Sequence, residues 1–225
     1  MIDVVYILKN HIIPTQELIY SLRSLVNFPY RKVWFAGGKP DDIEPDEYLK
    51  VNQKGNTKWE KTTYTVRKVC ECDEITKSFW LFNDDFFILK KVEYLPPIYN
   101  GDLKQRLKTI GQSLYSVKLQ ETLAELQRRD LGIKNYAVHI PMLINKDKAL
   151  EVLEEFEGNP MFRCLYGNYW KIGGADMPDV KIRTNGETFP EDAQFVSTSD
   201  VTFKWGEAGR MIRTKFQEPS RFEVL

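Results

Sequence analysis

The sequence predicts an α/β protein with a mostly parallel central sheet, folded as a single domain over residues 1–225. Short β-branched and aromatic runs alternate with stretches whose apolar residues follow helical spacing, which is the pattern of repeated strand and helix units. With 42% hydrophobic and 13% aromatic residues, a chain of 225 residues is long enough to bury one large core. The initial order of strand, helix and strand favours a right-handed crossover between parallel strands.

The first part of the chain contains most of the expected sheet. Strands are predicted over 2–8, 32–36, 79–82 and 86–89, and helices over 15–27 and 58–73. The stretch 39–55 is polar and contains two prolines, which predicts an irregular surface loop. Acidic residues at the end of the third strand fit a nucleotide-binding α/β fold.

The second part is expected to be richer in helices. Helices are predicted over 100–130, 146–157, 161–170 and 206–216, and extended runs over 136–142 and 194–197. Gly111 is expected to split the first of these helices in two. The same helical stretch is basic, which indicates either a solvated face or recognition of an anionic acceptor.

Three polar residues interrupt the strongest apolar stretch, residues 78–89. Asn83, Asp84 and Asp85 lie between two predicted strands, where adjacent carboxylates repel each other and are costly to desolvate. A Mg²⁺ or Mn²⁺ ion bound to Asp84 and Asp85 would relieve that repulsion and bridge to a substrate's phosphates. The alternative is a tight turn whose aspartates pair with a nearby lysine, Lys90 or Lys91. Repulsion alone predicts that Asp85→Asn leaves the metal-free protein at least as stable as the wild type.

Composition narrows the classes of partner. The 32 basic and 32 acidic side chains cancel, so no overall field attracts nucleic acid or an anionic membrane. The 3 cysteines include a Cys-x-Cys pair, whose spacing is a poor disulfide geometry, and indicate reduced thiols. No signal-peptide pattern is present, and no apolar run approaches the roughly 20 residues that cross a bilayer. These features predict a cytoplasmic protein without membrane insertion.

Histidine and arginine side chains supply further candidates. His139 is one of 2 histidines and lies just before Pro141, at an expected junction of strand and helix where side chains tend to face a cleft. The alternative is a structural role, which is the more common one for a lone histidine. Arg163 offers a guanidinium that binds phosphate bidentately, and Arg23 offers another unless it pairs with an acid beside its own helix.

Five blocks of sequence occur in an order that covers most of the chain. They are Ile2–Tyr6, Glu17–Ser24 followed by Arg31–Phe35, Phe82–Phe87, His139–Asn145 with Phe162 and Arg163, and Gln194–Asp200 with Glu218–Glu223. In content and order these blocks resemble the conserved regions of the Stealth family. That family comprises the capsular polysaccharide phosphotransferases and relatives that include the lysosomal-enzyme N-acetylglucosamine-1-phosphotransferase. The most specific of the matching motifs is Phe-Asn-Asp-Asp-Phe-Phe at 82–87.

The resemblance implies a glycosyltransferase-A-like, nucleotide-sugar-binding fold with a helical insertion. Residues 1–95 would form the nucleotide-sugar-binding part, and residues 96–225 would complete the acceptor and catalytic part. The implied activity is a metal-dependent transfer of a glycosyl or sugar-phosphate group from a nucleotide-sugar donor. The acceptor would be a hydroxyl of a carbohydrate or another polymer, with nucleic acid among the acceptors left open.

The residues receive roles within this interpretation. The catalytic candidates are His139, Asp84, Arg163 and Asp200, the donor-binding candidates are Tyr6, Arg23 and Asn83, and the ligands of Mn²⁺ or Mg²⁺ are Asp84 and Asp85. His139 is the expected general base, because an imidazole with an ordinary pKa of about 6.5 exchanges protons near neutrality. Asp200 is the next candidate for the base.

A rival interpretation is a carbohydrate- or nucleic-acid-binding module that keeps the same fold without turnover. It is supported by a departure from the family, which continues after the opening tyrosine with Thr-Trp-Val-Asp-Gly. This chain has Ile7-Leu-Lys-Asn-His11 there and lacks that acid. The retained Asn-Asp-Asp motif, His139 and Arg163 favour the enzyme.

Overall fold

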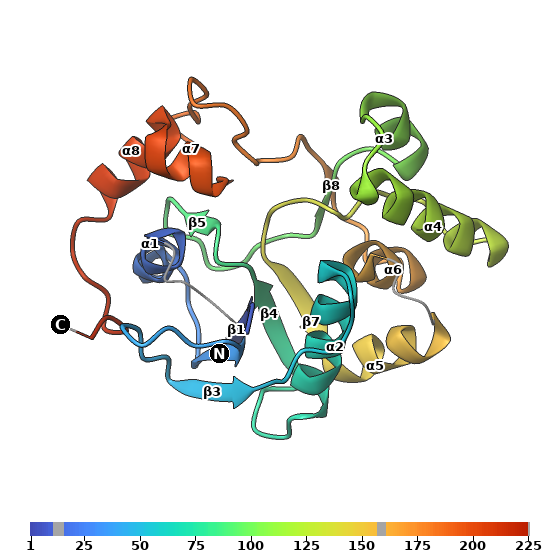
Figure 1. The fold of residues 1–225 in the computed structure, drawn as a ribbon, viewed down its shortest axis with the longest axis horizontal. Helices are drawn as coiled ribbons and strands as arrows, with labels where there is room; N and C mark the ends of the chain where they lie inside the picture. Colours follow the sequence, from blue (N-terminus) through green and yellow to red (C-terminus); the bar gives the residue numbers. More distant parts are fainter. Residues whose placement is uncertain (11–15, 157–160, 225) are drawn as a thin grey trace.

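A five-stranded sheet with the order β3-β2-β1-β4-β7 forms the centre of the structure (Figure 1). The computed structural model describes residues 1–10, 16–156 and 161–224. The strands are β1 (Asp3–Leu8), β2 (Val33–Gly37), β3 (Glu47–Lys50), β4 (Ser78–Phe82) and β7 (Met142–Asn145). Strands β3, β2, β1 and β4 are parallel to one another, and β7 is antiparallel to β4. The predicted α/β class with a mostly parallel sheet is therefore confirmed.

Most helices occur where the apolar spacing predicts them. They are α1 (Gln16–Ser24), α2 (Lys58–Glu71), α5 (Lys146–Glu155), α6 (Phe162–Tyr169) and α8 (Glu207–Lys215). The predicted split at Gly111 gives α3 (Leu103–Thr109) and α4 (Leu114–Arg128), which form the helical insertion at one side of the sheet (Figure 1). The expected ends of two helices at Thr15 and Glu157 lie outside the described residues. None of the described helices is long and apolar enough to cross a membrane.

The sheet separates two cores, because successive side chains of a strand point to opposite faces. Val4 and Tyr6 of β1 pack with Leu18 and Leu22 of α1 on one face. Val5 points to the other face, where the core includes residues of α2, α4, α5 and α6. A third core joins α7 (Asp200–Trp205) and α8 to two short antiparallel strands, β5 (Phe86–Ile88) and β9 (Phe195–Ser197).

Two expectations about secondary structure are wrong. The stretch 39–55 contains β3, an edge strand whose residues alternate between half-buried and exposed, so its polar sequence resembles a loop. The extended run expected over 136–142 is irregular as far as Pro141, and strand β7 begins only at Met142. The carbonyls of Val138 and Ile140 accept hydrogen bonds from an arginine side chain instead of from a neighbouring strand.

Candidate active site

The strand order places the Asn-Asp-Asp motif at the point where the chain stops adding strands on one side of β1 and adds the next strand on the other side. From β1 the chain continues to β2 and β3 on one side, and then to β4 on the other side of β1. In open α/β sheets, ligands bind in the crevice outside the carboxyl ends of strands at such a switch point. Lys9 and Asn10 follow β1 there, and residues 83–85 follow β4.

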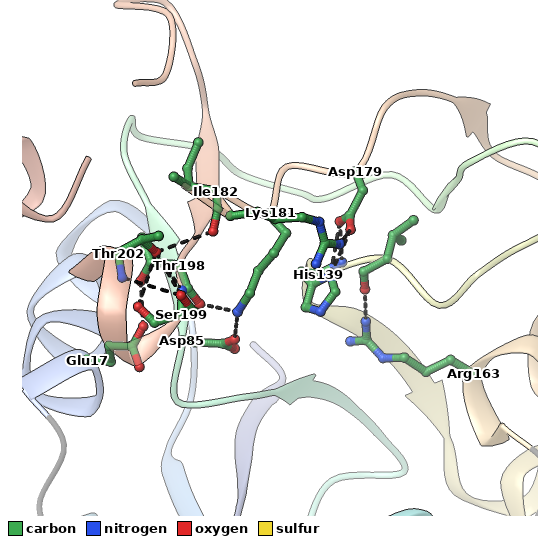
Figure 2. Close-up of polar contacts among 12 residues, drawn as sticks. Glu17, Asp85, His139, Arg163, Asp179, Lys181, Ile182, Thr198, Ser199 and Thr202 are labelled. Carbon is green, nitrogen blue, oxygen red and sulfur yellow. Dashed lines mark hydrogen bonds and ion pairs between the residues drawn. The ribbon is translucent and has the colours of Figure 1, made fainter. Parts of the chain in front are cut away.

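Asp85 forms a largely buried ion pair with a residue distant in sequence (Figure 2). Lys181 Nζ lies 2.5 Å from Asp85 Oδ2 and also donates to the carbonyl of Thr198. The other oxygen, Asp85 Oδ1, is buried and has no hydrogen-bond partner among the described residues. Asp84 and Asp85 do form a turn, but the lysine that pairs with Asp85 is Lys181 and not a neighbour in sequence.

Asp84 is largely removed from solvent and lies beside the Asp85 carboxylate. Burial, followed by the charge of Asp85, raises the pKa of Asp84 to about 6, although Lys9 acts in the opposite direction. Tyr6 is fully buried next to this motif, and its hydroxyl lies 2.9 Å from Ser21 Oγ. Tyr6 is thus part of the core beneath Asp84. Carboxyl groups whose pKa is raised by burial and by a neighbouring charge are common at functional sites.

Glu17 connects α1 to the start of α7. Its side chain is buried, and Glu17 Oε1 accepts a hydrogen bond of 2.5 Å from Thr198 Oγ1. Burial, followed by a hydrogen bond with Asp200, raises the pKa of Glu17 to about 9. Near neutral pH, Glu17 therefore keeps its proton, and its side chain shares a hydrogen bond with Asp200.

Replacing Glu17 by glutamine is expected to raise the free energy of unfolding at pH 8 by about 2 kcal/mol. The folded protein keeps the Glu17 proton up to about pH 9, whereas the unfolded chain releases it near 4.5, so stability falls as the pH rises between these values. Glutamine cannot ionise but can still bond to Thr198.

Urea unfolding at pH 4 and pH 8 measures this effect. The higher free energy of unfolding of Glu17→Gln should be present at pH 8. It should be absent at pH 4, where both the folded and the unfolded wild-type chain carry the Glu17 proton. Glu154→Gln, on the exposed face of α5, is the matched control and should change neither value. Equal stability of Glu17→Gln and wild type at pH 8 would show that Glu17 is ionised in the fold.

Asp179 orients His139 (Figure 2). His139 Nδ1 lies 2.9 Å from Asp179 Oδ2, and the backbone N–H of His139 donates to Oδ1 at 3.0 Å. Burial opposes ionisation of Asp179, but the hydrogen bond from His139 and the charges of His139 and Arg183 lower its pKa to about 2. In the neutral form of the ring, an Nδ1–H bound to this carboxylate leaves the lone pair on Nε2, which can then accept a proton. The His139 side chain is 31% exposed, so a substrate can reach it.

One short segment, residues 179–183, supplies the partners of both Asp85 and His139. Ile182 N–H donates to the Ser197 carbonyl at 2.8 Å, and Lys181 forms a parallel bridge with Ser197. The segment therefore runs beside β9, which pairs with β5. Asp179 and Lys181 do not belong to the predicted site. Their signal in the sequence is the alternation of charged and apolar residues in Asp-Val-Lys-Ile-Arg, a period typical of a half-buried strand.

Arg163 holds the segment that carries His139. Its Nη1 and Nη2 donate to the carbonyls of Val138 and Ile140, both at 2.5 Å. No carboxylate of the described residues lies within ion-pairing distance of Arg163, and Asp85 acts on it only at longer range. Burial lowers the pKa of Arg163 to about 10, so the group is still cationic at neutral pH.

The contacts of Arg23 favour a structural role for this side chain over phosphate binding. Its Nε and Nη2 donate to the Glu223 carboxylate at 2.9 and 2.6 Å, and its Nη1 donates to the carbonyls of Phe216 and Gln217. Most of the five N–H donors of this guanidinium are therefore used in holding the C-terminal segment against α1. Asn83, by contrast, is exposed at the end of β4.

The residues of the Asp-Asp motif fit a cation site in which the substrate supplies the remaining ligands. No group of three or more His, Cys, Asp or Glu side chains in the described part of the chain is arranged to hold a metal ion. Mg²⁺, however, commonly binds through one or two carboxylates together with water and substrate phosphates. Asp85 Oδ1, which has no partner in the described part of the chain, and the neighbouring Asp84 carboxyl are oxygen atoms of the type that such an ion binds.

Comparisons with known proteins do not identify a family for this chain. No protein-family model matches the chain, and a search of curated proteins finds no significant match. The resemblance to the Stealth family therefore stays a prediction.

Proposed function

We propose that the protein is a metal-dependent transferase that uses a nucleotide-sugar donor. It would pass a glycosyl or sugar-phosphate group to a hydroxyl of a carbohydrate or another polymer. The observation that carries this proposal is the pair Asp84 and Asp85 at the sheet's switch point, where Asp85 Oδ1 is buried without a hydrogen-bond partner among the described residues. The mostly parallel sheet with one antiparallel edge strand supports the glycosyltransferase-A-like fold that the resemblance implies.

In this function Asp84 and Asp85 would hold Mn²⁺ or Mg²⁺, which supplies charge neutralisation for the donor diphosphate. His139 Nε2 would take the proton of the acceptor hydroxyl as its oxygen attacks the donor. Attack on the anomeric carbon breaks the bond to the phosphate oxygen and releases a nucleoside diphosphate. Attack on the β-phosphorus instead releases a nucleoside monophosphate. Asp179 would stabilise the imidazolium that forms.

The three candidates for donor binding have different expected roles, because their burial and contacts differ. Asn83 is exposed beside the acidic pair and is placed to contact the donor. Tyr6 is fully buried and would act by supporting the motif from the core. Arg23 forms an ion pair with Glu223, so it is not expected to bind a donor phosphate.

Thermal unfolding with a panel of nucleotide sugars, with and without Mn²⁺, tests the proposal. A donor present at 100 times its dissociation constant should stabilise the protein by about 2.7 kcal/mol, and only when Mn²⁺ is present. The donor that stabilises is then incubated with the protein and Mn²⁺, and release of nucleoside monophosphate or diphosphate is measured. If no nucleotide sugar stabilises the protein, the proposal is wrong.

A non-catalytic carbohydrate- or nucleic-acid-binding module is the second candidate. The observation that favours it is Lys181, whose ammonium group already neutralises Asp85. A binding module would bind its polymer without consuming a nucleotide sugar. Donor hydrolysis that depends on Mn²⁺ separates the two functions.

Lys181→Gln is expected to bind Mn²⁺ about tenfold more tightly than the wild type, because the lysine ammonium competes for Asp85 Oδ2. Titration calorimetry measures the affinity. Lys91→Gln changes the net charge equally at an exposed position near the motif and should leave Mn²⁺ affinity within about twofold. If Lys181→Gln loses Mn²⁺ affinity, then Lys181 organises Asp85 and does not compete with the cation.

A further inference from the structure

A pocket of about 320 Å³ lies beside β7, which is one of the two edge strands of the sheet. Aromatic residues and prolines make up much of its wall, namely Trp80, Tyr94, Tyr136, Pro96, Pro97 and Pro141. This volume is near the lower end of the range for small-molecule sites, about 300–1,000 Å³. The pocket therefore suits a small unit, such as one residue of a larger polymer.

The aromatic walls are held in fixed positions. Trp80 is buried and packs edge-on against Phe28 and Tyr94, with ring centroids 5.4 and 5.7 Å apart. Tyr136 is tied by a hydrogen bond of 2.8 Å from its hydroxyl to the Gly173 carbonyl. Tyr94 is 55% exposed and so forms the accessible side of the pocket. Rigid aromatic faces pack well against the apolar C–H face of a sugar ring.

The polar side chains of the wall give the pocket a positive charge. Arg163 and Lys148 both line it, and none of the described residues in its wall is acidic. Arg163 is neutralised by no ion pair with a described residue and donates only to main-chain carbonyls. A partly buried cation without a carboxylate partner is costly, and an anionic group on a ligand would offset that cost.

The pocket also adjoins the proposed base. Val138 and Ile140 line it, and His139 between them binds Asp179. A ligand in the pocket would therefore lie against the same short segment that carries His139.

We propose that this pocket binds a saccharide unit that carries a carboxylate or a phosphate group. The ring packs on Tyr94 and Trp80, and the anion pairs with Arg163. That this unit belongs to the acceptor rests on the proposed transferase function, whereas its binding does not. In that function Arg163 contacts the acceptor and not the donor phosphates, which refines its predicted role.

The proposal is tested by titrating the whole protein with three sugars, in the absence of nucleotide and metal. Binding is measured by ligand-observed NMR. The probes are glucose, glucuronic acid and glucose 6-phosphate. At least one anionic sugar should bind at least tenfold more tightly than glucose, and this preference should shrink as salt is added. Preference for glucuronic acid identifies a carboxylated unit, and preference for glucose 6-phosphate identifies a phosphorylated one.

Variants locate the binding site. Tyr94→Ala, at an exposed position, should weaken the anionic sugar at least tenfold, while Trp205→Ala, an exposed aromatic outside the pocket, should not change it. Arg163→Gln should remove the preference over glucose. Because Arg163 also holds two carbonyls, Lys148→Gln provides a second charge variant and should reduce the preference in a protein that melts normally.

Three results would overturn the proposal: no binding of any probe at 50 mM, equal binding of all three, or unchanged binding by Tyr94→Ala. The transferase function fails separately, if no nucleotide sugar is bound or consumed with Mn²⁺. Sugar binding without donor turnover would leave the pocket in place and assign it to a binding module.

Discussion

His139→Ala should lose about 10²- to 10⁴-fold in the rate of transfer while it binds donor and Mn²⁺ nearly as the wild type does. The bond from His139 Nδ1 to Asp179 leaves Nε2 as the free base, so removal of the ring removes proton abstraction and no proposed metal ligand.

Single-turnover rates at saturating donor measure this loss, and donor affinity is measured separately. Asp179→Asn is the informative companion, since it keeps the ring but removes the carboxylate that selects its tautomer. If His139 is structural, His139→Ala should instead melt at a lower temperature and keep activity in proportion to its folded fraction. Loss of donor affinity with normal turnover would make His139 a phosphate-binding group, and Asp200 would become the candidate base.

The elements with strong apolar patterns could be predicted from the sequence. Strands β1 and β4 are nearly continuous apolar runs, and α2 begins and ends close to its predicted limits. Strand β3 could not be predicted, because an exposed edge strand needs few apolar residues. Helix α7 has only 6 residues, too few to show a helical period, and the prediction contains no helix there.

The candidate site was predictable only where its residues adjoin in sequence. Asp84 and Asp85 are neighbours, and a buried strand before them places both at the sheet edge. The contacts that give the site its chemistry join distant residues: His139 meets Asp179 across 40 positions, and Asp85 meets Lys181 across 96. Such pairs depend on how β9 and segment 179–183 pack against β5, which local propensity does not encode.

Asp85→Asn is expected to abolish Mn²⁺-dependent donor binding, because it removes the negative charge of one of the two proposed carboxylate ligands. The structure changes the expectation for stability. The Lys181 side chain is 11% exposed and pairs with Asp85, so the variant leaves a buried ammonium without its carboxylate. The metal-free variant should therefore be less stable than the wild type by about 2 kcal/mol, although repulsion between the two aspartates alone predicts the opposite.

The double variant Asp85→Asn/Lys181→Gln separates the two effects. Removing the unpaired ammonium should restore most of the lost stability in urea unfolding, since a neutral pair needs no countercharge. Mn²⁺ titration and donor binding should stay absent, because the carboxylate ligand is still missing. Donor binding with Mn²⁺ by either variant would overturn the metal assignment of Asp85. A single variant as stable as the wild type would show that Lys181 finds another partner, and that its ion pair with Asp85 contributes little to the fold.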